Sequence, residues 1–126
     1  MATPRTTKFG ITIAEWDDVR ARARAFLIAC ARERRITTYG ELTDVLRPAK
    51  VPYHSYAMVA LLDGLDTAED AARGVMLASL VCSKATGMPS EGYFRCAAGL
   101  SRDTGDRVAF WEAEVERVYD AFSEES

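Results

Sequence analysis

The apolar residues of segment 12–34 recur at steps of three and four positions, which is the spacing of one helix face. They are Ile13, Trp16, Val19, Ala23, Phe26, Leu27 and Cys30. At the start of this segment, Thr12 and Glu15 stand three positions apart, as in a capping box whose two side chains satisfy backbone N–H groups. The pattern therefore predicts a long amphipathic helix from Thr12 to about Arg34.

Three shorter helices are expected at about residues 38–46, 55–63 and 66–73. The first begins with a second capping box, Thr38 and Glu41, and follows a short β-branched strand over residues 36–38. Gly64 and Gly74 follow the other two, and glycine is common just beyond a helix C-terminus.

The C-terminal half predicts a β-hairpin and a last helix. Residues 76–83 are the most strand-like run of the chain, and residues 93–97 are expected to return beside them. The loop between them, residues 84–92, contains two glycines and a proline, and we expect Met88 to be exposed at its tip. The last helix, over residues 106–122, carries one apolar stripe and an acidic outer face.

Helix, short strand, two helices and a β-hairpin wing form the element order of a winged helix-turn-helix domain, here with an added C-terminal helix. We therefore expect an α+β, winged-helix-like single domain over residues 1–126, with frayed polar tails at 1–11 and 123–126. Apolar residues make up 48% and charged residues 28% of the chain, as in ordinary globular proteins. No apolar run is long enough for a membrane span or a secretory signal, which predicts a cytoplasmic protein.

The cysteine and histidine content argues against a metal site. Cys30, Cys82 and Cys96 stand at unrelated spacings, and His54 is the only histidine. Zinc sites normally show paired ligand spacings that this chain lacks. We expect free thiols and no metal or other cofactor.

Residues 37–42, Thr-Thr-Tyr-Gly-Glu-Leu, resemble the start of the DNA-binding domain of alkylguanine DNA alkyltransferases, which has a similar Thr-Tyr-Gly-Glu-Leu run. The resemblance implies a winged-helix fold and contact with DNA. In that family a later Pro-Cys-His-Arg motif supplies a reactive thiolate, whereas here Ser83 and not histidine follows Cys82. The base that would activate the thiol is missing. We therefore expect no catalytic residue and interpret Cys82 as a small buried apolar residue.

Charge is distributed unevenly along the chain. Residues 1–50 hold 10 Lys/Arg against 6 Asp/Glu, and residues 51–126 hold 6 against 13. The first predicted helix and the residues just after it contain six arginines: Arg20, Arg22, Arg24, Arg32, Arg34 and Arg35. This set is either a phosphate-binding stripe or a solvated face paired with nearby acids such as Asp17, Asp18 and Glu33.

In a DNA-binding winged helix, the third helix and the wing face the DNA. The candidate contact residues are Arg34, Arg35, Lys50, His54, Ser55, Tyr56, Lys84 and Arg95. The third helix has no Arg, Lys, Asn or Gln between Ser55 and Asp63, and these are the side chains that read base edges best. Loop 84–92 can equally be a purely structural hairpin loop.

Three functions remain open from the sequence. The first is a non-enzymatic DNA-associated regulator or accessory protein that binds duplex DNA through the third helix and the wing. The second is a protein–protein adaptor on the same scaffold, which would use the expected exposed Met88. The third is an alkyltransferase-like sensor of DNA damage without transfer activity. The first and last helices could in addition form a homodimer interface.

Overall fold

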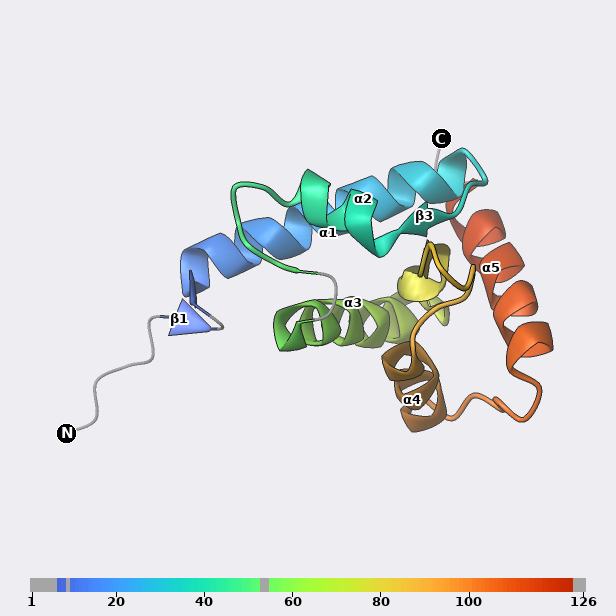
Figure 1. Cartoon of the computed structure of the whole chain (residues 1–126). Helices are drawn as coiled ribbons and strands as arrows, with labels where there is room; N and C mark the ends of the chain where they lie inside the picture. The colour runs from blue at the N-terminus through green and yellow to red at the C-terminus, as the bar shows by residue number, and fades with distance from the viewer. Residues whose placement is uncertain (1–6, 9, 53–54, 124–126) are drawn as a thin grey trace.

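The computed structural model describes residues 7–8, 10–52 and 55–123, and in these it is α+β and predominantly helical (Figure 1). The helices are α1 (Ile13–Arg32), α2 (Tyr39–Val45), α3 (Tyr56–Arg73), the 3₁₀ helix η1 (Leu77–Leu80), α4 (Glu91–Gly99) and α5 (Arg107–Ser123). The strands are β1 (Thr7–Lys8), β2 (Ile11–Thr12), β3 (Thr37–Thr38) and β4 (Val81–Cys82). Within this described part, no helix combines the length and the apolar character needed to cross a membrane.

Helix α1 forms where the apolar spacing predicts it. The backbone N–H of Glu15 donates to Thr12 Oγ1 at 3.1 Å, and the Glu15 carboxylate accepts the Thr12 hydroxyl at 3.0 Å. Residues 1–11 were expected to be a frayed tail, and this was wrong for residues 7, 8 and 11. There β1 and β2 pair antiparallel, and Ile11 is buried against the core. Burial of this one large side chain favours the short hairpin over a frayed chain.

The second predicted cap is also present. Thr38 Oγ1 accepts from the backbone N–H of Glu41 at 3.1 Å and starts α2. Residues 37–38 form the expected strand, β3, but it pairs with β4 in parallel. Thr37 lies opposite Val81 in this register. A parallel pair needs a long connection, and here the connection contains α2, α3 and η1.

Residues 56–73 form one helix, so the predicted break at Gly64 was wrong. A glycine inside a helix costs about 1 kcal/mol relative to alanine. Continuing the helix beyond Gly64 buries Leu65 and places Asp66 and Glu69 in the interior. Helix α3 ends at Gly74, as predicted, where φ is +70° and a left-handed residue closes the helix.

Residues 76–83 were expected to be a strand, but only Val81 and Cys82 are extended in a ladder. Two buried carboxylates explain the difference. Asp66 Oδ1 accepts from the Ala78 N–H at 2.7 Å, and Glu114 Oε2 accepts from the Met76 N–H at 2.9 Å. In a strand, these two N–H groups would need carbonyl partners on a neighbouring strand. Because the two carboxylates accept them instead, the segment can form η1.

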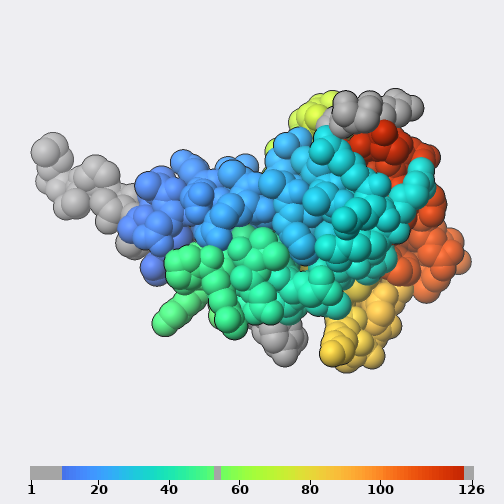
Figure 2. All heavy atoms as spheres, turned by 90° about the horizontal axis from the view of Figure 1, so that it is seen from above, coloured from blue at the N-terminus to red at the C-terminus, as the bar shows by residue number. Residues whose placement is uncertain are grey.

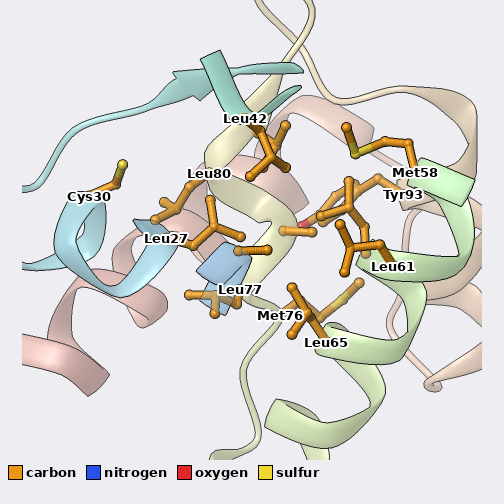
Figure 3. Packing of buried hydrophobic residues seen from close by; sticks show 14 of the residues in the cluster. Leu27, Cys30, Leu42, Met58, Leu61, Leu65, Met76, Leu77, Leu80 and Tyr93 are labelled. Atoms are coloured by element: carbon orange, nitrogen blue, oxygen red, sulfur yellow. The ribbon is translucent and has the colours of Figure 1, made fainter. Parts of the chain in front are cut away.

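η1 lies at the centre of the core and contacts α1, α3 and α5. Figure 3 shows Leu77 and Leu80 of η1 among side chains from the surrounding elements, including Leu27 and Leu61. Tyr93 enters the same core, and its hydroxyl lies 2.5 Å from Ser79 Oγ. The buried hydroxyls of Ser79 and Tyr93 therefore satisfy each other.

The predicted returning strand at 93–97 is helix α4, so the hairpin wing expected over 76–97 does not form. The residues that face the core are Tyr93, Phe94 and Ala97, and their spacing suits a helix as well as it suits a short strand. Since β4 is already paired with β3, and α3 packs against α4, no strand partner is needed there.

Helix α5 packs against α1, as its apolar stripe suggested (Figure 1). Val118 and Phe122 are fully buried, and Trp111 donates from Nε1 to the Ser79 carbonyl at 2.8 Å. Most of the two stripes is thus covered within one chain, while Ile13 and Val108 at their N-terminal ends stay exposed. A homodimer through these two helices remains a prediction.

We expect Asp66→Ala to lower the free energy of unfolding by about 1–3 kcal/mol, because the Ala78 N–H would be left buried without an acceptor. Asp66→Asn keeps an acceptor oxygen in the same place, and its loss should be smaller, at about 1 kcal/mol or less. Urea denaturation followed by tryptophan fluorescence would measure both values. Equal losses in the two variants would show that this hydrogen bond is not the source of the stabilisation.

A pH dependence follows from the same carboxyl group. Burial raises the pKa of Asp66 well above its usual value, and the neighbouring carboxylates Asp63 and Glu114 add to the shift. An acid whose pKa is raised on folding stabilises the protein fully below its unfolded pKa, about 4, and less as the pH rises toward the folded pKa. Wild type should therefore lose stability relative to Asp66→Asn between pH 4 and 8, measured by urea denaturation. A constant difference, or a gain by wild type, would contradict this.

Candidate nucleic-acid interface

Most arginines of this protein are engaged within the fold. Nine arginines of the described residues form ion pairs: Arg22, Arg24, Arg34, Arg35, Arg47, Arg73, Arg102, Arg107 and Arg117. Several of these pairs join the basic front half to the acidic back half, for example Arg24 to Glu69 at 2.6 Å. Much of the uneven charge along the chain is therefore matched across the folded molecule.

Arg34 and Arg35, two of the candidate DNA contacts, belong to this matched set. Arg34 pairs with Asp120 at 3.0 Å and Glu116 at 3.4 Å, and its guanidinium lies over the Tyr119 ring. Arg35 pairs with Glu33 at 2.8 Å and with Glu41 at 3.4 Å. These half-exposed pairs are screened by water and weak individually. They nevertheless reduce the positive potential that a phosphate would meet, so we leave both arginines out of the interface.

The alternative reading of the α1 arginines receives direct support at several positions. Arg22 donates to Asp18 at 2.9 Å and to the carbonyls of Leu46 and Arg47, each at 2.9 Å. The Arg22 side chain therefore connects α1 to the residues that follow α2 by hydrogen bonds. Such arginines act as structural connections between helices and not as a free phosphate-binding stripe.

Among the basic side chains whose surroundings the structure describes, four have no ion pair within 4 Å: Arg20, Lys50, Lys84 and Arg95. Arg95 nevertheless interacts electrostatically with the nearby carboxyl groups of Asp63 and Glu91. Three of the four are candidate contacts from the sequence. Lys50 is exposed in the segment before α3, Lys84 is exposed in the turn after β4, and Arg95 is exposed on α4. In Figure 2 the segment before α3 (green) and the turn after β4 (gold) project from the same edge of the molecule.

The start of α3 follows the segment that holds Lys50 and presents an unusual pair of side chains. Tyr56 is 84% exposed and Val59, one turn later, is 40% exposed. Ser55 is the N-cap: its hydroxyl accepts from the Met58 N–H at 3.1 Å and donates to the Pro52 carbonyl at 2.6 Å. Because the Ser55 hydroxyl already donates one hydrogen bond and accepts another within the fold, we interpret Ser55 as a helix cap and not as a contact residue. His54 lies outside the described residues.

The turn after β4 has a defined shape. Gly87 has φ +71°, a left-handed conformation that favours glycine, and its N–H donates to the Ser83 carbonyl at 2.8 Å. Met88 was expected to be exposed at the tip and is instead half-buried against the core, while its carbonyl accepts from the Ser83 N–H at 2.9 Å. The tip is formed by exposed residues 84–87, so Lys84 projects and Met88 anchors the turn.

A small cavity lies beneath the surface, between α2, α3 and α4. Its volume is about 30 Å³, and its lining includes Tyr39, Asp66, Ser90 and Tyr93. This is enough for one or two water molecules. Tyr39, which the sequence reading did not select, bridges the helices: its hydroxyl donates to Ser90 Oγ at 3.0 Å and accepts from the Ser90 N–H at 3.1 Å.

None of the three cysteines lines this cavity. Cys82 is buried at β4, and burial raises the pKa of its thiol to about 11. Burial and nearby carboxylates raise the pKa of Cys96 to about 12, and burial also raises that of Cys30. The described residues contain no group of three or more His, Cys, Asp or Glu side chains that could hold a metal ion.

Comparison of the chain with protein-family models, with curated proteins and with solved structures finds no significant match. The side chains and their surroundings in this fold are therefore the basis for inferring a function.

The thiols provide a test of the expectation that the protein has no reactive cysteine. At pH 8 a thiol of pKa 11 is ionised to about one part in a thousand, so native protein should react slowly with the thiol reagent DTNB. Unfolding in urea should expose all three cysteines to rapid reaction. A native thiol that reacts as fast as free cysteine would reopen the alkyl-transfer hypothesis, and Cys82→Ser would show whether Cys82 is responsible.

Proposed function

We propose that the protein is a non-enzymatic DNA-associated regulator or accessory protein that contacts duplex DNA through Lys50, Lys84 and Arg95. The proposal depends on one observation: three of the basic residues that the sequence predicts as DNA contacts have no ion pair in the structure. Most arginines are held in ion pairs, whereas these three cations, selected from the sequence, have none. Lys50 and Lys84 are therefore available to neutralise phosphates, and so is Arg95, whose charge is partly offset by the nearby carboxyl groups of Asp63 and Glu91.

The element order supports the same proposal. The series α1, β3, α2 and α3 matches the helix, strand, helix, helix part of a winged-helix domain, although the hairpin is replaced by β4, a turn and α4. In this arrangement α3 takes the place of the recognition helix and the turn after β4 takes the place of the wing tip. We therefore propose the winged-helix relationship together with the function.

The expected binding is weak and of low sequence specificity. The net charge of the chain is −3, and three phosphate contacts give a slope of log K against log salt of only about −2 to −3. The exposed start of α3 presents Tyr56 and Val59, which cannot hydrogen-bond to base edges in the bidentate manner of Arg, Asn or Gln. An accessory role fits this chemistry better than recognition of a single operator.

A protein adaptor is the second candidate, because Tyr56 and Val59 give the surface an apolar element. Met88 no longer contributes to that argument, since it packs against the core. The damage-sensor hypothesis has less support, because a cavity of about 30 Å³ is too small for a nucleobase.

The test is fluorescence anisotropy of a labelled random duplex across a salt series. We expect measurable binding at low salt that weakens as salt rises. The double variant Lys84→Ala/Arg95→Ala should reduce the salt slope by nearly two, because each lost phosphate contact removes about 0.9.

Arg20→Ala is the matched control. Arg20 is also without an ion pair, but it lies on α1 beside Leu65 and Ala68, away from the start of α3. Its removal should leave the slope almost unchanged. Absence of binding at low salt and micromolar protein, or equal effects of the double variant and the control, would refute the proposed surface.

A further inference from the structure

Tyr56 is the most exposed of the large hydrophobic side chains in the described residues, at 84%. It is the first residue of α3, directly after the N-cap Ser55, and Val59 lies one turn along on the same face. Most aromatic side chains in this chain are buried or partly buried, such as Trp16 and Tyr93. A ring held in solvent in this way contributes little to the core and is available to a partner.

The surroundings of Tyr56 indicate what kind of partner it suits. The only polar group of its side chain is the hydroxyl at the ring tip, and the cation Lys50 lies six residues before it in the chain without an ion pair. Proteins that bind unpaired nucleotides combine cations for the phosphates with aromatic rings on which bases stack. A ring has no preference for one base, because every base has a π face.

We propose that Tyr56 stacks on an unpaired base, and that the protein therefore prefers DNA containing unpaired nucleotides over fully paired duplex. The inference rests on the proposed DNA contact and adds the class of DNA that the same surface selects. A fully paired duplex offers only base edges and backbone to α3, whereas an unpaired nucleotide offers a whole base face. The ring of Tyr56 then gains a stacking contact in place of water.

The experiment compares three labelled DNA probes of equal length: a fully paired duplex, a duplex with one bulged 2-aminopurine, and a single strand. We expect wild type to bind the bulged duplex and the single strand more tightly than the paired duplex. Tyr56→Ala should weaken binding to both by roughly five- to hundredfold, the range for loss of one stacked base. Tyr56→Phe, which keeps the ring, should retain the preference.

The fluorescence of the bulged base gives a readout that separates stacking from a general loss of affinity. Saturating wild type or Tyr56→Phe should quench 2-aminopurine, since stacking on an aromatic ring quenches it, and Tyr56→Ala should not. The salt slope should be the same in all three proteins, because tyrosine carries no charge. Thermal unfolding checks that Tyr56→Ala folds, as expected for a side chain that is 84% exposed.

Val108→Ala is the matched control for an exposed apolar residue. Val108 is 51% exposed on the first turn of α5, on a different helix from Tyr56. Its removal should leave the preference among the three probes unchanged.

Two outcomes would overturn the proposal in distinguishable ways. If the double variant Lys84→Ala/Arg95→Ala loses binding while Tyr56→Ala keeps the wild-type preference, the DNA contact stands and the stacking role is wrong. If wild type binds none of the probes, the proposed function fails and the stacking role fails with it. In that case Tyr56 and Val59 would belong to a protein-binding surface.

Discussion

Two buried carboxylates hold the segment after Gly74 at the centre of the molecule. Asp66 and Glu114 are at most 2% exposed, and they accept the N–H groups of Ala78 and Met76. Unpaired, these buried donors would each cost a desolvation penalty of about 1–3 kcal/mol. Because η1, β4 and the turn with Lys84 follow from this segment in order, the two carboxylates also determine where the candidate interface begins.

The desolvation cost of burying the Glu114 carboxylate is offset by its interactions with two arginines. Arg117 pairs with it at 2.6 Å, and the Arg102 guanidinium lies 3.8 Å away. A buried ion pair rarely stabilises a fold by its Coulomb energy alone, because desolvation costs about as much. Here the carboxylate also accepts the Met76 N–H, so one side chain connects α5 to the residue before η1 and lies beside two cations. Part of their charge is thereby offset within the molecule.

Structural elements that are determined by residues close in the chain were predicted from the sequence. Elements that are determined by contacts with distant residues were not. Thr12 and Thr38 cap their helices through contacts three residues away, and both helices were predicted. The strand expected at 76–83 was wrong because its donors find acceptors 12 and 38 residues away. The strand expected at 93–97 was also wrong, since these residues belong to α4 and β4 pairs with the distant β3 instead. The same limit applies to the site: a sequence shows that Arg34 and Lys84 are basic, but not that Arg34 has acidic partners on α5.

Charge matching within the fold also constrains how any DNA contact could work. A surface with only three free cations on a chain of net charge −3 cannot depend on phosphate attraction as a polybasic surface does. Nor can the exposed start of α3 supply bidentate base-edge hydrogen bonds, since its accessible side chains are Tyr56 and Val59. Under the proposed function, the remaining source of discrimination would be contact with base faces, which are accessible in DNA where bases are unstacked. The internal ion pairs that stabilise the helices would then favour selection of unpaired DNA over selection of a particular base sequence.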